Sequence, residues 1–111
     1  MTGSPDVTPD PTWSNAMHSY LQENLKKVRN NDQKQKHRDA VISLCQRLSL
    51  SLPNGMNTRL ADLEPTILRQ FAHDTWSNAS TRARNLRTYQ AIINNWNTYN
   101  PEETVINHFT M

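Results

Sequence analysis

The 111-residue chain has one cysteine, two glycines and no long apolar run. A single thiol, Cys45, cannot form an internal disulfide and has no second cysteine at metal-ligand spacing. Two glycines cannot supply a glycine-rich phosphate loop, and the four histidines form no metal-binding pattern. A membrane span would need about 18 consecutive apolar residues. We therefore expect no metal, no other cofactor and no membrane-spanning segment.

Recognisable catalytic patterns are also missing. The serines, histidines and acids follow no triad arrangement, and no acid pair stands in a catalytic frame. Residues 1–11 are acidic and proline-rich, whereas a secretory signal is basic and then apolar. These absences predict a protein that is not an enzyme and has no small-molecule substrate. They also predict an intracellular location, in the cytoplasm or nucleoid or in a nucleus.

What the chain does have is an uneven distribution of charge. The overall net charge is +2, but all twelve lysines and arginines lie within residues 26–87, together with only five acids. This middle segment therefore carries +7, and both flanks are acidic. A basic patch of this kind attracts polyanions, and nucleic acid is the commonest one inside cells. The simpler alternative is an ordinary solvated surface with an excess of cations.

The periodicity of the apolar residues predicts an all-α fold, a compact bundle of four to five helices. Residues 1–13 are expected to form a disordered acidic and proline-rich leader, residues 14–100 a helical domain, and residues 101–111 a short helix or a tail and linker. Within the domain, three- and four-residue spacings predict helices over about 14–30, 32–48, 62–76 and 80–100. The alternation in residues 48–52 is interpreted as a helix end and loop, since no second run could pair with it.

The fourth predicted helix offers the clearest candidate binding face. If Leu86, Tyr89, Ile93 and Trp96 point inward, the periodicity directs Arg84, Arg87, Thr88, Ala91 and Asn95 outward. Arginine, asparagine and small side chains suit the major groove of DNA. Backbone N–H groups at the helix start, near Thr81, could bind a phosphate oxygen. The same side chains are also common on any solubilising surface, so both interpretations remain open.

The first half of the second predicted helix is also basic, with Lys34, Lys36, His37 and Arg38 close together. If its basic face and that of the fourth helix point to the same side, the two helices would form a clamp on nucleic acid. Binding of this kind should weaken steeply as salt rises.

Three segments resemble a known family. Residues 60–71 (LADLEPTILRQF), residues 80–96 (from STRARNLR to Trp96) and the pair Asn100 and Pro101 resemble the third helix, the fourth helix and the linker start of one domain. This is the N-terminal core-binding, SAM-like domain of tyrosine recombinases and phage integrases. The resemblance implies a SAM-like orthogonal bundle that forms half of a C-shaped clamp around double-stranded DNA. It is also compatible with copies assembling as a homo-oligomer on DNA.

Carried over by position, the resemblance implies DNA contacts from two helices. The implied residues are Lys34, Lys36, His37 and Arg38 on the second helix, and Thr81, Arg82, Arg84, Arg87 and Thr88 on the fourth. On the helical wheel, Arg82 lies nearer the core side than the others. The family's tyrosine nucleophile belongs to a separate catalytic domain, so the resemblance assigns no catalytic residue in this chain.

Two hypotheses of other classes remain. The chain could be a structural subunit, such as a helical viral coat protein or nucleoprotein, which packs through Trp13, Trp76 and Trp96 and binds nucleic acid without sequence preference. Alternatively, it could be a small protein-interaction module whose charge is incidental.

Overall fold

The described part of the chain folds into four α-helices and three short 3-10 turns. In a computed structural model, residues 11–27 and 29–105 are described. The expected leader, except for residues 11–13, and the tail beyond residue 105 lie outside the described residues. The helices are α1 (Trp13–Leu25), α2 (Asn31–Ser49), α3 (Pro65–Thr75) and α4 (Ala79–Tyr99), and the turns are η1 (Gly55–Asn57), η2 (Leu60–Asp62) and η3 (Pro101–Glu103). Across the described ranges there is no strand, only one isolated bridge between Thr12 and Arg59. The predicted all-α bundle is confirmed.

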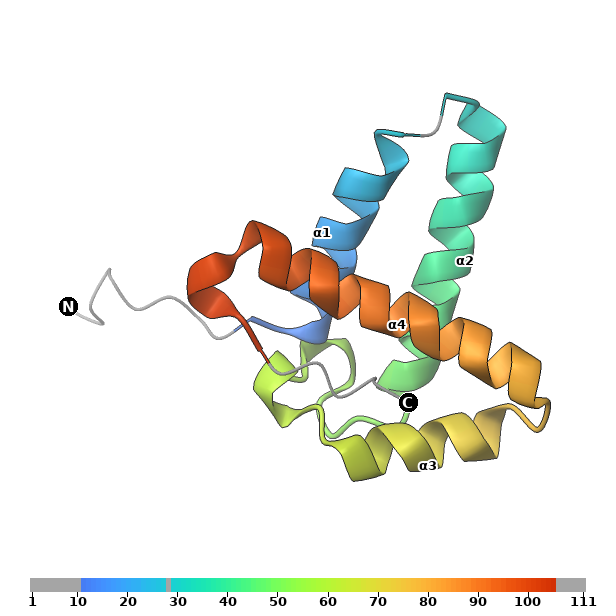
Figure 1. Cartoon of the computed structure of the whole chain (residues 1–111), viewed down its shortest axis with the longest axis vertical. Coiled ribbons are helices and arrows are strands. Elements are labelled where there is room, and N and C mark those ends of the chain that lie inside the picture. The colour runs from blue at the N-terminus through green and yellow to red at the C-terminus, as the bar shows by residue number, and fades with distance from the viewer. Residues whose placement is uncertain (1–10, 28, 106–111) are drawn as a thin grey trace.

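The helices form two pairs that cross each other. In Figure 1, α1 and α2 run side by side in opposite directions, α4 crosses both of them, and α3 lies along the other side of α4. The side of α4 that faces α1 and α2 is therefore turned away from α3 (Figure 1). This arrangement decides which side chains of α2 and α4 can act together.

Local sequence signals explain where the helices begin. Thr12 and Asn15 form a capping box at the start of α1. The side chain of Asn30 accepts hydrogen bonds from two backbone N–H groups of α2, and that of Asn78 accepts one from Thr81. Pro65 occupies the first turn of α3, where its missing N–H has no cost. The sequence suggests Asp32 as the cap of α2, but the cap is Asn30, two residues earlier.

The end of α1 differs from the prediction. The helix ends at Leu25, about five residues before the expected position. Leu25 is half-buried, while Lys26 and Lys27 are exposed, so the apolar face has no further core to cover at this point. The backbone N–H of Lys27 then bonds to the carbonyl of Asn24 and closes a turn.

One hydrophobic core joins all four helices, and aromatic rings occupy its centre. Trp13 is fully buried, donates its indole N–H to the carbonyl oxygen of Cys45 at 3.1 Å, and meets Tyr89 edge to face at 5.7 Å between ring centroids. Phe71 packs against both Trp76 and Tyr89. Assigning Trp13 to a disordered leader was therefore wrong, because this residue opens α1 and fills the core. The three- and four-residue spacing of Ala40, Leu44 and Leu48 predicts that Ala40 lies on the apolar face of α2, but this residue is exposed.

The burial of the tryptophans also bears on the structural-subunit hypothesis. That hypothesis uses Trp13, Trp76 and Trp96 for packing between copies, but each is at most 8% exposed within this chain. All three side chains are therefore buried in the chain's own core, which leaves little of their surface for packing between copies.

The segment before α1 is held by a distant part of the chain. The backbone N–H of Trp13 donates to the carbonyl of Thr58 at 2.9 Å, and that of Leu60 donates to the carbonyl of Pro11 at 2.9 Å. Thr58 is itself fully buried, and its hydroxyl accepts a hydrogen bond from the backbone N–H of Asn54. These bonds fix the start of α1 against the loop between α2 and α3.

Candidate nucleic-acid interface

The first half of the outward face of α4 is as predicted from the periodicity, whereas Asn95, further along the helix, is half-buried and bonded to Ser19 of α1. Tyr89, Ile93 and Trp96 are buried on the opposite side, while Arg84 and Arg87 are exposed and Thr88 is half-buried. The hydroxyl of Thr88 donates to the carbonyl of Arg84 one turn earlier, at 3.4 Å, so this side chain stays close to the helix. The two arginines therefore extend beyond their neighbours on this face.

Part of this face meets α2 in a shared pocket. The pocket measures about 230 Å³, and its lining includes His37, Ala40 and Leu44 from α2, Tyr20 from α1, and Arg84, Asn85 and Thr88 from α4. Three of the predicted site residues, His37, Arg84 and Thr88, thus come together from two helices that are distant in sequence. The exposure of Ala40 follows from this arrangement, since its methyl group lines the pocket.

The remaining basic residues of α2 diverge around the helix. Lys36 and Arg38 flank His37 and, at about 100° per residue, point to directions about 160° apart. Both are exposed, whereas Lys34 is half-buried and lies on the same side of α2 as His37. One flat ligand surface cannot contact all four residues equally. Lys34 and His37 are the two that share the side of the pocket.

Arg82 lies outside the shared pocket. Its guanidinium donates a hydrogen bond to the carbonyl oxygen of Trp76 at 2.9 Å, across the connection from α3 to α4. On the helical wheel Arg82 is about 160° from Arg84. The side chain therefore ties the two helices together, and it lies on the opposite side of α4 from the face that carries Arg84.

Thr81 is also engaged at the start of α4. Its backbone N–H bonds to the side chain of Asn78 at 3.1 Å, and this bond takes one of the donors that a phosphate could have used. Thr81 is half-buried. The periodicity places it on the same side of α4 as Arg84, one turn closer to the helix start.

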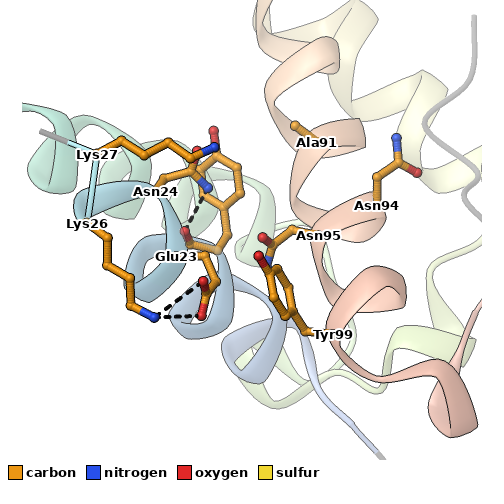
Figure 2. Close-up of a pocket in the computed structure, with 9 residues that line it drawn as sticks. Glu23, Asn24, Lys26, Lys27, Ala91, Asn94, Asn95 and Tyr99 are labelled. Atoms are coloured by element: carbon orange, nitrogen blue, oxygen red, sulfur yellow. Dashed lines mark hydrogen bonds and ion pairs between the residues drawn. The ribbon is translucent and has the colours of Figure 1, made fainter.

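Sequence reasoning missed Tyr20, which lines two pockets. Besides the α2–α4 pocket, its side chain lines a larger one of about 420 Å³ between the second halves of α1 and α4. Figure 2 shows this second pocket, with Glu23 and Asn24 on one side and Asn95 and Tyr99 on the other. The spacing of Met17, Tyr20 and Leu21 predicts that all three lie on the apolar face of the first helix, and nothing in that spacing distinguishes a core residue from one at the edge of the core.

Burial affects the titration of three groups near this edge. Burial, and then the neighbouring Cys45, raise the pKa of Tyr20 above its ordinary value. The same two causes raise the pKa of Tyr89, against a smaller lowering effect of Arg47. Burial raises the pKa of the Cys45 thiol to about 12. All three groups therefore stay protonated and uncharged at neutral pH, and Tyr20 keeps a hydroxyl that can donate.

No group of three or more metal-ligating side chains occurs among the residues that the structure describes. Within those same residues, no helix has both the length and the apolar character required to cross a bilayer.

Comparisons of the chain with protein families, with curated proteins and with solved structures find no match.

Proposed function

We propose that this chain is a DNA-binding helical domain that contacts double-stranded DNA through α2 and α4. In this proposal it has no catalytic activity of its own and works inside the cell, in the cytoplasm or nucleoid or in a nucleus. The observation that carries the proposal is the pocket that His37 of α2 shares with Arg84 and Thr88 of α4. Two helices contribute to one surface, as a clamp requires.

The dimensions of α4 support contact with a major groove. From Arg84 to Ala91 the outward face is about 10 Å long, so it fits within the major groove, which is about 12 Å wide. Arg84 and Arg87 would therefore reach base edges or phosphates near the groove while the second half of α4 lies over a flanking backbone. Thr88 and Ala91 are small and would allow the helix to approach closely.

The charge distribution supports the same proposal. The segment that contains α2 and the first half of α4 carries the net charge of +7. Duplex DNA releases counterions when cations neutralise its phosphates, and this release favours binding at low salt. The resemblance of residues 60–71 and 80–96 to core-binding domains of tyrosine recombinases points to the same ligand, and we extend the proposal to membership of that class of domain.

The test is binding of labelled duplex DNA, followed by fluorescence anisotropy over a range of salt concentrations. We expect the logarithm of the affinity to fall linearly with the logarithm of the salt concentration. Arg84→Gln should weaken binding by about tenfold and reduce the salt slope by about one. Arg69→Gln is the matched control, because Arg69 is also an exposed helical arginine but lies on α3, on the other side of α4 from α1 and α2.

Two results would overturn the proposal. One is unchanged anisotropy of the duplex at low salt with micromolar protein. The other is an equal loss of affinity in Arg69→Gln and Arg84→Gln, which would indicate diffuse attraction to the whole positive surface. Sedimentation without DNA distinguishes this proposal from the structural-subunit hypothesis, since a stable assembly of many copies would favour a structural subunit.

A further inference from the structure

The larger pocket lies outside the α2–α4 surface and has a different character. It measures about 420 Å³ and lies between the ends of α1 and α4, with its lining drawn in Figure 2. Pockets of about 300 Å³ or more are large enough for a small organic ligand. Ala91 is the smallest lining residue. The lining combines amides and phenols with the charged side chains of Glu23, Lys26 and Lys27, whereas arginine and histidine mark the α2–α4 pocket.

Two of the amides are held in place by hydrogen bonds to α1. Asn24 donates one side-chain N–H to the carbonyl oxygen of Tyr20 at 2.9 Å, and Asn95 donates one to the hydroxyl of Ser19 at 3.2 Å. Each bond uses one N–H of the amide and leaves its carbonyl oxygen and second N–H for a ligand. A fixed amide with one acceptor and one donor can pair with the edge of a nucleobase, and asparagine with adenine is the best-known case.

An aromatic ring is exposed beside these amides. Tyr99, at the end of α4, is one of two large hydrophobic residues that are strongly exposed in the described part of the chain, with 56% of its surface accessible. Its ring lies next to Asn95 at the edge of the pocket (Figure 2). Exposed tyrosine rings commonly serve as stacking platforms for unpaired bases.

The charge of the pocket favours an anion at one end. Glu23 is already paired with Lys26 at 3.2 Å, so these two charges compensate each other. Lys27 is the third charged residue in the lining and gives it one net positive charge. Lys27 is exposed and lies just beyond the end of α1, where a phosphate could reach its ammonium group from solvent.

We propose that the pocket between α1 and α4 binds a nucleotide. The base stacks on Tyr99, with its edge on the amides of Asn24 and Asn95, and the phosphate binds Lys27. The nucleotide has two possible sources, a free mononucleotide or an unpaired nucleotide in a nucleic-acid strand. Binding of a mononucleotide does not depend on the duplex contacts proposed for α2 and α4, so either proposal can fail without the other.

The experiment is an NMR titration of the full chain with three probes: adenosine monophosphate, a single-stranded tetranucleotide of deoxyadenosine, and inorganic phosphate. We expect adenosine monophosphate to shift the side-chain amide signals of Asn24 and Asn95 in a saturable way. Inorganic phosphate should shift only signals near Lys27. Tighter binding of the tetranucleotide at the same signals would identify a strand as the source, and equal or weaker binding would identify the free nucleotide.

Two variants and one control test the assigned contacts. Tyr99→Ala should weaken binding of adenosine monophosphate by at least about fivefold, the lower end for the loss of one stacking ring. Lys27→Ala should weaken it by about threefold, in line with an exposed ion pair. Arg69→Ala, an exposed basic residue of α3 outside this pocket, should leave it unchanged. Each altered side chain is exposed, and circular dichroism checks that the helices remain folded.

Three outcomes would overturn the proposal. The first is unshifted Asn24 and Asn95 signals with both nucleotide probes. The second is a complete set of shifts with inorganic phosphate alone, which would indicate a simple anion site. The third is equal weakening by Lys27→Ala and Arg69→Ala.

Discussion

At the scale of single residues, Tyr89 places a hydroxyl at the centre of the bundle. The residue is fully buried, and its hydroxyl donates to the carbonyl oxygen of Leu44 at 2.7 Å. Tyr89→Phe would leave that carbonyl oxygen without this donor in an apolar environment, so we expect a loss of about 1 to 2 kcal/mol in the free energy of unfolding. Urea denaturation measures it. Tyr99→Phe is the control and should change stability by less than about 0.5 kcal/mol, because Tyr99 is exposed.

Burial of Cys45 makes the free energy of unfolding decrease at alkaline pH. Burial raises its pKa from 9.0 to about 12, so the folded state keeps the thiol proton while the unfolded state loses it above pH 9. The folded state then binds more protons, and stability falls as pH rises from about 9 to 12. The thiol alone accounts for up to about 4 kcal/mol of this fall.

The measurement is urea denaturation of the parent chain and of Cys45→Ala at several pH values between neutral and about pH 11. We expect a smaller fall in the variant than in the parent chain. Tyr20 and Tyr89 contribute in the same direction, so the variant should still lose some stability. Parallel losses in both proteins would show that the thiol is not protected by burial.

Arg82 and Arg84 are two residues apart but should respond differently to the same substitution. Arg82→Gln removes the hydrogen bond to the carbonyl of Trp76, and we expect it to lower stability by about 1 kcal/mol while leaving DNA affinity of the folded protein nearly unchanged. Arg84→Gln should instead lower the DNA affinity and leave the stability nearly unchanged. Thermal denaturation and anisotropy on both variants measure the two quantities. A larger loss of affinity in Arg82→Gln would place the binding face on the other side of α4.

Sequence reasoning identified Arg84, Arg87 and Thr88 because the apolar row of the fourth helix marks its buried side, and these three residues lie on the other side. It could not identify the partner of Arg82, since the carbonyl of Trp76 comes close only after α3 and α4 have packed. Sequence reasoning also could not identify the role proposed for Asn24 and Asn95. Asparagine is frequent along the chain, and its significance here depends on which amides α1 holds in place.

At the scale of the helix, α2 depends on one side chain at its start. Asn30 accepts bonds from the N–H groups of Asp32 and Gln33, at 2.8 and 3.2 Å. Asn30→Ala should therefore lower stability by about 1 kcal/mol. Asn31→Ala, at the neighbouring exposed position, should be neutral or slightly stabilising, because alanine is the best helix former. Thermal denaturation compares them, and equal losses in both variants would contradict a capping role for Asn30.

The helices also differ in how well their sequence predicts them. The place of Pro65 in the first turn of α3 and the extent of α4 agree with the prediction because proline and a long apolar row are strong local signals. The helix itself begins about three residues later than predicted, since Leu60–Asp62 form the separate turn η2. The end of α1 was placed too late because its periodic pattern extends past the point where the core ends. The turns η1 and η2 were not predicted, since they form around Thr58 and Leu60, which the segment before α1 holds from a distance.

At the scale of the whole molecule, one core should give one unfolding transition. Trp13, Trp76 and Trp96 belong to α1, the end of α3 and α4, and all are buried in the same cluster. Tryptophan fluorescence and far-ultraviolet circular dichroism should therefore follow a single urea transition with the same midpoint. A fluorescence change that precedes the loss of helix would show that the helices separate before they unfold.

The sequence predicted which helices carry the candidate residues, but not their arrangement. His37 and Arg84 share a pocket because α4 crosses α2, and no local signal encodes a crossing angle. Local signals also do not show which side of α2 faces α4. Only the packed structure therefore shows that Lys36 and Arg38, which point in directions about 160° apart, cannot both face the pocket.

The bonds between residues 11–13 and the segment around residues 58–60 have a consequence for biosynthesis. A ribosome releases α1 early, but Trp13 contacts Cys45, Thr58 and Tyr89, and these residues emerge later. Since domains fold as units once their parts are available, we expect Trp13 to stay unburied on the nascent chain until the segments that carry these partners have emerged. The nearest of these partners in the sequence, Cys45, lies 32 residues after Trp13, so a nascent chain that has not reached it exposes a large aromatic side chain.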